Sequence, residues 1–194
     1  MTEDDVDQKI RDAYLRRDDE LRRSWRRSLP FGDAMDDRWD RARRLGFGDG
    51  ASIYGSSVVY GDVSVGEKSW VGPMTLIDGS GGAVRIGSFC SISAGAYIYT
   101  HDTVMWALSG GRMGKRTGSV EIGDCVYIGS QCLILPKVII GTRVVVAANS
   151  MVNRDVPDNT IVAGTPARKI GRVEVDENGN VRLDYATRSN ASSS

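Results

Sequence analysis

The chain is poor in the residues that most often form metal sites or cross-links. Its 194 residues include one histidine, His101, and three cysteines, none of them in a CxxC spacing. Paired cysteines make a disulfide framework and clustered ones hold structural zinc, so we expect neither a disulfide nor a metal. The 25 basic and 25 acidic residues cancel, which leaves no overall charge to attract nucleic acid or an acidic membrane surface.

Long apolar runs are also missing. The sequence has no stretch of 18 apolar residues, and no charged segment followed by an apolar one at its start. We therefore expect a soluble, cytoplasmic protein. A chain of 194 residues is long enough for one substantial domain and an appendage.

What the sequence does contain is a repeat of six residues. Each hexad begins with Ile or Val, its second residue is usually Gly or Ala, and its fifth is small or β-branched. A period of six fits neither an α-helix nor an ordinary strand. Six uninterrupted hexads begin at Ile122, Ile128, Ile134, Ile140, Val146 and Val152.

This repeat predicts a triangular prism in which three hexads make one turn and successive turns stack as parallel strands, about 4.8 Å apart. The first residue of each hexad points inward and stacks on its equivalents. The second serves a corner where a larger residue would strain the backbone. The fifth fills the remaining corner, so we interpret Cys90 and Cys132 as packing residues and place Cys125 at an outward corner.

An earlier series of hexads starts at Ile53. Three extra residues within 78–83 predict a bulged corner, after which the series resumes at Ile86. It then gives way to an excursion loop over 103–119, a length that is usually functional or disordered. Eight hexads before this loop and six after it predict four to five coils. The other starts are Val59, Val65, Val71, Ile77, Ile92 and Ile98.

The two ends of the chain differ from the repeats. Residues 1–47 hold 12 basic and 12 acidic residues, with apolar residues at helical spacing, which predicts an amphipathic helical lid with a solvated face. An Arg-rich interaction arm is the alternative. Residues 48–171 form the repeat domain. In 172–194 we expect a small hairpin with an Asn-Gly turn, followed by a flexible tail.

The single histidine lies where the coil gives way to the excursion. Its outward offset within the hexad should align Ser80, His101 and Lys137 along one edge. An exposed imidazole can accept a proton from a hydroxyl or an amine near neutral pH. We therefore hypothesise that His101 is a catalytic base, the alternative being a structural histidine.

The segments IGDCVYIGSQCLILPKVIIG and VAGTPARKIG, with a histidine before an excursion loop, resemble the hexapeptide-repeat acyltransferases. The similarity is to the maltose, galactoside and polysaccharide-sugar O-acetyltransferases in particular, and it covers roughly residues 50–171. It implies a left-handed parallel β-helix and a homotrimer with acetyl-CoA between its subunits. It also implies direct acetyl transfer to a sugar hydroxyl, with His101 as general base.

The resemblance also implies roles for residues around the cofactor. The backbone N–H of Ser130 would stabilise the oxyanion, and Ala148 would contact the pantetheine arm of acetyl-CoA. The corner around Ala148 departs from the family's Gly-Ala-Gly-Ser, since it reads Ala-Ala-Asn-Ser. Arg168 and Lys169 would meet the CoA phosphates, and Tyr127 would shield the cofactor. Otherwise these are ordinary corner residues and solvated cations.

Three further residues are candidates for binding the acceptor. Asp78 resembles an acceptor-binding carboxylate, or else caps a turn. Asp102 would orient the imidazole or cap the start of the loop. Trp106 would stack on a sugar ring or anchor the loop.

Rival functions differ in how well they fit the sequence. Zinc enzymes on this scaffold need three histidines, and a nucleotidyltransferase fusion needs a large additional domain in front; serine acetyltransferase also matches poorly. An amino-sugar N-acetyltransferase and a non-catalytic scaffold remain open. Thiol release from acetyl-CoA would separate the enzymes from the scaffold.

Overall fold

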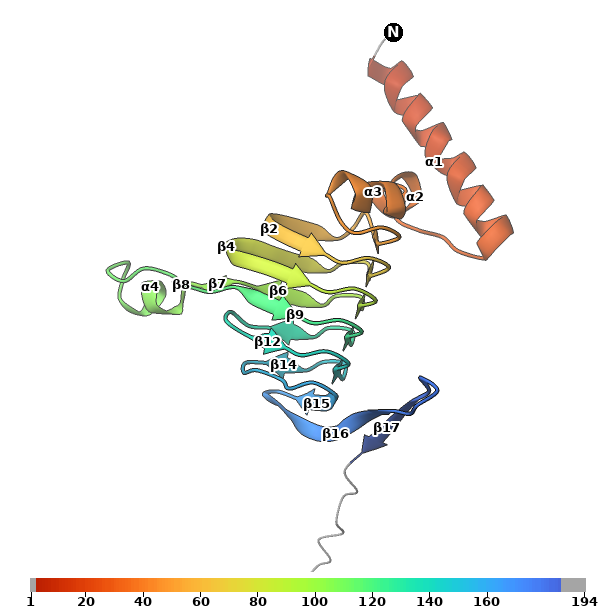
Figure 1. Cartoon of the computed structure of the whole chain (residues 1–194). Coiled ribbons are helices and arrows are strands. Elements are labelled where there is room, and N and C mark those ends of the chain that lie inside the picture. Colours follow the sequence, from red (N-terminus) through yellow and green to blue (C-terminus); the bar gives the residue numbers. More distant parts are fainter. Residues whose placement is uncertain (1–2, 186–194) are drawn as a thin grey trace, which may run out of the picture.

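The computed structural model describes residues 3–185, and most of them form a three-sided column of stacked coils (Figure 1). Tyr127 pairs in parallel with Val145 and Leu133 with Met151, in each case 18 residues or three hexads further along. The predicted period of three hexads per coil is therefore confirmed, and the chain is mainly β, with parallel strands wound into a β-helix.

Each face of the column is a stack of short strands. The first face holds β1 (Ser52–Ile53), β3 (Trp70–Val71), β5 (Ser91–Ile92), β10 (Tyr127–Ile128), β13 (Val145–Val146) and β15 (Thr160–Gly164). The second holds the first parts of β2 (Val58–Val65) and β4 (Leu76–Ile86), then β6 (Tyr97–Tyr99), β11 (Leu133–Ile134) and β14 (Met151–Val152). The third holds the last parts of β2 and β4, then β9 (Val120–Ile122) and β12 (Ile139–Ile140).

The core of the column is a ladder of the first residues of the hexads. All of them are buried except Val59, which is partly buried, and Ile98 lies with no exposed surface between Ile77 and Ile134. Cys90 and Cys132 are buried as predicted, and burial raises the pKa of both thiols. Stacking one apolar residue per hexad thus gives a continuous core from very short strands.

The second hexad position is small for a different reason than predicted. A Cβ on Gly129 would lie 2.5 Å from the backbone nitrogen of Ala148, so the second position is small because the next coil approaches closely. The left-handed backbone that strains a side chain occurs instead at the fourth position of the hexads, with φ between 54° and 71°. Apart from glycine, these left-handed residues are Lys68, Met74 and Phe89 before the excursion and Cys125, Gln131, Lys137, Arg143 and Asn149 after it.

A bulged corner interrupts the regular coils, as predicted. Gly61 pairs with Gly79, 18 residues on, but Val63 pairs with Val84, 21 residues on. The three extra residues therefore lie in the corner of β4, between the second and third faces.

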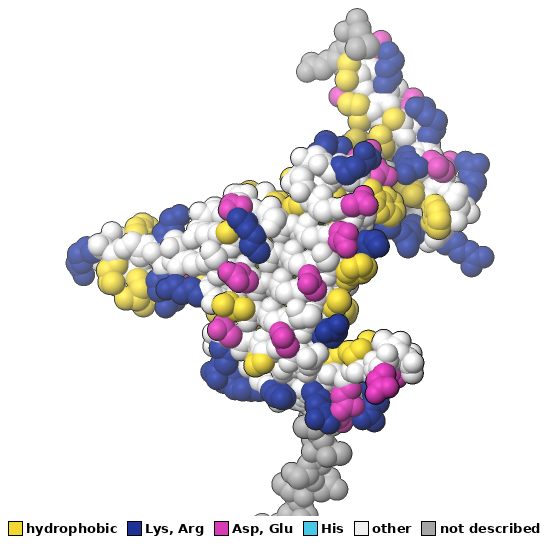
Figure 2. Space-filling view, viewed as in Figure 1, with side chains coloured by type: hydrophobic (Ala, Val, Ile, Leu, Met, Phe, Trp, Pro, Cys, Tyr) yellow, Lys and Arg dark blue, Asp and Glu magenta, His cyan; other side chains and the backbone are white. Residues whose placement is uncertain are grey.

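The excursion leaves the column at that same edge. It contains β7 (His101–Asp102), the short helix α4 (Val104–Leu108) and β8 (Arg116–Thr117), so it is more regular than the expected loop. β7 and β8 pair antiparallel and carry α4 out as an arm (Figure 1). The arm exposes apolar side chains, which include Trp106, Leu108 and Met113. Lys and Arg side chains flank the apolar surface of the arm (Figure 2).

The N-terminal helices are α1 (Glu3–Trp25), α2 (Phe31–Met35) and α3 (Arg38–Arg44). Arg41 donates hydrogen bonds to the carbonyls of Tyr54 and Ser57, which seats α3 on the first coil. α1 instead contacts α2 and projects away from the column (Figure 1). The expectation of a lid is therefore wrong for α1, which covers none of the faces and leaves Ile10 48% exposed, whereas the segment from α3 to Phe47 does close the end of the column.

At the other end, β16 (Ala167–Val175) and β17 (Val181–Tyr185) form the expected hairpin, which continues the first face through β15. The expected flexible tail lies outside the described residues. Among residues 3–185, no helix is both long and apolar enough to cross a bilayer.

Candidate functional site

His101 lies at the edge between the second and third faces, directly above the bulged corner. The hydroxyl of Thr100, which is fully buried, donates to the carbonyl of Asp78 at 2.6 Å and accepts from the N–H of Gly81 at 3.0 Å. A Cβ on Gly81 would lie 2.5 Å from the Cβ of His101, so only glycine fits beneath the imidazole. The bulge and the histidine strand are therefore joined into one rigid unit.

The imidazole faces a buried carboxylate. Nδ1 of His101 lies 3.3 Å from Oδ2 of Asp78, whose side chain is 7% exposed against 24% for His101. Nδ1 is shielded from water and is not aligned for a hydrogen bond, so the exposed part of the ring lies on its other side. Oδ1 of Asp78 accepts from the N–H of Ser80 at 2.9 Å. A carboxylate at Nδ1 favours the tautomer whose Nε2 is free to accept a proton.

Asp102 caps the start of the arm. Its Oδ1 accepts from the N–H of Val104 at 3.0 Å, and its Oδ2 lies 2.8 Å from Nη2 of Arg116 on β8. These two interactions, the one with Arg116 first, hold the pKa of Asp102 below its usual value. Of its two expected roles, the geometry therefore matches the loop cap.

Other candidates lie further along the same edge. Trp106 belongs to α4 on the projecting arm, where it is 53% exposed. Lys137 packs its side chain against Gly118 and donates its backbone N–H to Ser119, so the returning arm is inserted between Lys137 and His101.

Ser130 and Ala148 occupy a different edge, the one between the first and second faces. They stack in successive coils: the N–H of Asn149 donates to the carbonyl of Ser130 at 2.8 Å, and both Ser130 and Ala148 are exposed. Tyr127 is exposed on the first face beside this edge. Within one chain, the structure does not bring these residues to His101.

Arg168 and Lys169 lie at the base of the column. With Arg154 they line a cavity of about 190 Å³ below the last coil, and the side chains of Arg168 and Lys169 are exposed. Three cations against one carboxylate, Asp155, give the cavity a net positive lining, which suits phosphate groups. Within residues 3–185, no group of His, Cys, Asp and Glu side chains is arranged to hold a metal ion.

Sequence reasoning missed Thr100, Gly81 and Arg154. The run of glycines in the bulge signalled a close backbone approach, but it did not show what approaches. Nothing in the sequence marks Thr100, because its partners lie 19 and 22 residues away.

Comparison with known proteins identifies the repeat. Residues 119–154 match the family model described as bacterial transferase hexapeptide, six repeats. The chain is 32% identical over 120 residues to a chloramphenicol acetyltransferase of Escherichia coli, covering 52% of this chain and 57% of the relative. It is 46% identical over 54 residues to the putative lipopolysaccharide biosynthesis O-acetyl transferase WbbJ of Escherichia coli K12, covering 28% of each chain.

Solved structures give a similar result. A variant of AntD, an N-acyltransferase from Bacillus cereus in complex with dTDP-4-amino-4,6-dideoxyglucose and coenzyme A, superposes with a TM-score of 0.55 at 26% identity. The match covers 68% of this chain and 87% of AntD. The expected resemblance to hexapeptide-repeat acyltransferases is confirmed. The chain spans little more than half the length of the first curated relatives it matches.

Proposed function

Because residues 119–154 carry the bacterial transferase hexapeptide repeat, we propose that this chain is an acetyl-CoA-dependent acetyltransferase acting on a hydroxyl of a sugar or saccharide. The observation that carries the proposal is the His101–Asp78 pair at the column edge, because it leaves the exposed side of the imidazole available as a base. The similarity to WbbJ, whose name is putative lipopolysaccharide biosynthesis O-acetyl transferase, supports a saccharide acceptor.

The reaction we propose is a direct transfer. Nε2 of His101 takes the proton of the acceptor hydroxyl while the oxygen of that hydroxyl attacks the thioester carbonyl of acetyl-CoA. The backbone N–H of Ser130 donates to the resulting oxyanion. As the C–S bond breaks, the imidazolium returns the proton to the CoA thiolate, which leaves as the free thiol beside the acetyl ester. Asp78 holds the ring in the tautomer that this exchange needs.

The cofactor would run along the edge of Ser130 and Ala148 toward the base of the column. There Arg168 and Lys169, joined by Arg154, would neutralise phosphate charge, and the 190 Å³ cavity between them supports this assignment. Tyr127 would cover the cofactor from the first face. On the acceptor side we retain Asp102 and Trp106 as candidates that shape the entrance, while Asp78 acts on the imidazole.

A complete site needs a second copy of the chain. Since His101 and Ser130 lie on different edges, we propose a homotrimer in which the His101 edge of one subunit faces the Ser130 edge of the next. Cyclic symmetry lets the same two edges form every interface.

The proposal also includes the arrangement of the chain. Residues 48–171 form the acyltransferase domain, wound as a left-handed β-helix, with the helical segment 1–47 before it and the hairpin and tail 172–194 after it. The protein would act in the cytoplasm, where its acetyl donor is found.

A thiol-release assay tests this function. Wild-type protein should release CoA thiol from acetyl-CoA with a saccharide acceptor, and His101→Ala should lower the rate by about 10²–10⁴-fold. Acetyl-CoA affinity, measured by calorimetry, should stay unchanged in that variant. A protein that neither binds acetyl-CoA nor releases thiol with any sugar would be a scaffold instead.

Transfer to an amine is the second candidate. AntD is an N-acyltransferase and was solved with an amino sugar attached to a nucleotide, which favours testing such acceptors. Mass spectrometry of the product, before and after mild alkaline treatment that cleaves esters but spares amides, separates the two.

A further inference from the structure

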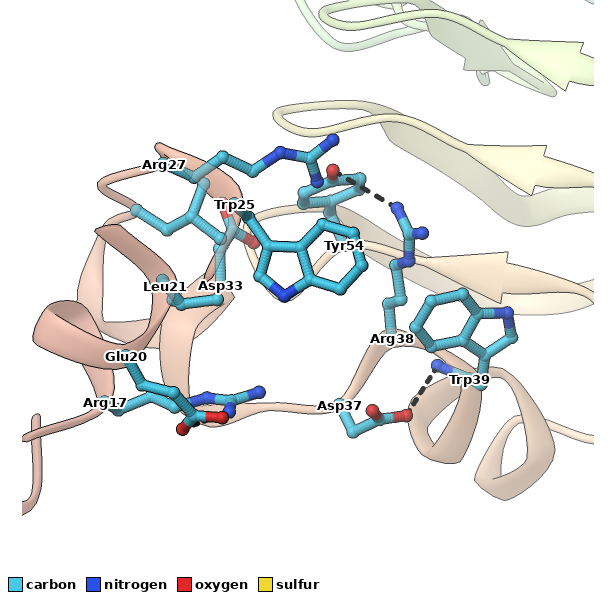
Figure 3. Close-up of a pocket in the computed structure, with 11 residues that line it drawn as sticks. Arg17, Glu20, Leu21, Trp25, Arg27, Asp33, Asp37, Arg38, Trp39 and Tyr54 are labelled. Atoms are coloured by element: carbon cyan, nitrogen blue, oxygen red, sulfur yellow. Dashed lines mark hydrogen bonds and ion pairs between the residues drawn. The ribbon is translucent and has the colours of Figure 1, made fainter. Parts of the chain in front are cut away.

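The N-terminal end of the column holds a cavity of about 420 Å³ that shares no lining residue with the candidate active site. It lies between the end of α1, the segment that follows it, α3 and the first coil (Figure 3). Its volume falls within the range of small-molecule binding sites.

The sequence builds this cavity by reversing the chain after α1. Arg26 adopts a left-handed backbone with φ 53°, which ends the helix and turns the chain back. The returning segment is then fastened: the hydroxyl of Tyr14 donates to the carbonyl of Leu29 at 3.0 Å, and that of Ser28 donates to Asp18 at 3.0 Å. The fixed return leaves a hollow between α1 and α3, instead of letting α1 pack on the column.

Three aromatic side chains line the hollow: Trp25 and Trp39, which are exposed, and Tyr54, which is half-buried. Trp25 is 68% exposed and extends into the cavity between Tyr54 and Arg38 (Figure 3). Trp39 is 46% exposed, although the guanidinium of Arg38 stacks 4.0 Å from its ring. Flat rings with an open face stack on other flat or weakly polar surfaces.

The charges around the cavity balance. Its lining includes Arg17, Arg27 and Arg38 against Glu20, Asp33 and Asp37, three of each sign. A ligand of either net charge would therefore meet as much repulsion as attraction. A neutral ligand with many hydroxyl groups would meet both donors and acceptors.

These polar groups keep unused capacity. Arg38 donates from Nη1 to the hydroxyl of Tyr54 at 3.3 Å, one of its five possible donors. Asp33 and Asp37 each accept backbone N–H bonds through Oδ1, which leaves the other oxygen of each for a ligand. Arg27 forms no ion pair among the described residues.

We propose that this cavity is a saccharide-binding site separate from the acetyl-transfer site. A sugar ring stacks on Trp25, its hydroxyls accept from Arg27 and Arg38, and they donate to Asp33 and Asp37. The proposal does not depend on His101 chemistry. It would give a saccharide a second point of attachment and raise its local concentration at the protein.

The test uses the full-length protein with maltotriose, chitotriose and galactotriose as probes, in saturation-transfer NMR and fluorescence titrations. We expect at least one trisaccharide to bind, with Trp25→Ala and Arg27→Ala each weakening it at least about tenfold. Trp25→Phe should restore part of the affinity because it keeps a ring. Ile10→Ala is the matched control on the same helix and should bind like wild type.

Four results would overturn the proposal. These are the absence of binding by all three sugars, binding that Trp25→Ala and Arg27→Ala leave unchanged, ADP or CoA displacing the sugar from this cavity, and a Trp25→Ala variant that loses self-association in sedimentation. Loss of self-association would mean that a second copy of the chain occupies the cavity. Because Trp25 is largely exposed, circular dichroism should show an intact fold in its variants.

Discussion

Asp78 makes two contacts, of which the sequence predicted only the turn cap. One oxygen caps the turn at Ser80, and the other faces Nδ1 of His101. At 5% exposure it has little surface left for an acceptor sugar. We therefore interpret Asp78 as a positioning residue that acts through the imidazole.

Asp78→Asn separates the two roles, because the amide keeps an acceptor oxygen for Ser80 and removes the charge. We expect turnover to fall on the order of a hundredfold, with the KM for acetyl-CoA changed less than about twofold. Steady-state thiol release measures both. Asp78→Ala also removes the cap and should lower the unfolding midpoint. If Asp78→Asn and Asp78→Ala were both as active as wild type, the carboxylate would have no part in the reaction.

Gly81 is a second position at which adding one carbon atom should disturb the site. Its alanine variant must push against the Cβ of His101 and the carbonyl of Thr100, at 2.5 and 2.7 Å. Gly81→Ala should cost about 1–3 kcal/mol of unfolding free energy and reduce turnover. Gly114→Ala is the matched control, since nothing lies within 4 Å of its Cβ and it should change stability by less than about 0.5 kcal/mol. Urea denaturation compares the two, and equal effects would contradict this geometry.

At the scale of elements, the arm is a short antiparallel ribbon fixed at its base. β7 and β8 pair His101 with Thr117 and Asp102 with Arg116, and the N–H of Gly118 donates to the carbonyl of Thr100 at 2.9 Å. The ion pair at Asp102 is therefore the side-chain fastening of the strand that carries the proposed base.

This fastening predicts a pH dependence. The folded state holds the pKa of Asp102 below its ordinary value of about 4, so its stabilising effect is complete above that value. It is lost as the pH falls through the lowered folded value, when the carboxylate takes a proton. Hydrogen exchange should therefore show weaker protection of the Gly118 amide on acidification below about pH 4. In Arg116→Ala the protection of the Gly118 amide should be weaker at neutral pH and should change less with pH. A pH response like that of wild type in this variant would contradict the prediction.

At the scale of the molecule, the two halves of the proposed site lie on different edges of one column. His101 lies between the second and third faces, whereas Ser130, Ala148 and the path to Arg168 follow the edge between the first and second. Under the proposed function, an active site exists only where two subunits meet.

Subunit mixing tests this arrangement. His101→Ala and the double variant Arg168→Ala, Lys169→Ala should each be inactive or weak alone. Co-expressed in equal amounts, they should recover about a quarter of wild-type activity per chain, because random mixing places an intact histidine edge beside an intact cofactor edge in about one interface in four. Sedimentation should give a trimer. No recovery in mixed trimers would place both halves in the same subunit.

The repeat made most of the fold predictable. The inward Ile and Val, the burial of Cys90 and Cys132, and the bulge before Ile86 follow from a six-residue period, which each hexad expresses locally. The predicted lid over 1–47 is wrong for α1, because helical spacing shows which side of that helix is apolar without showing where the helix points. The turn at Arg26 decides that direction.

The six-residue period alone predicts a parallel column with the single histidine at an edge, because stacked coils are the way to bury one apolar residue per hexad. The folded chain is needed to show that Asp78 faces the imidazole, that Ser130 lies on another edge and that the helices enclose a cavity. These relations depend on how far the chain rotates around the column between residues distant in sequence, and a local sequence pattern does not predict that rotation.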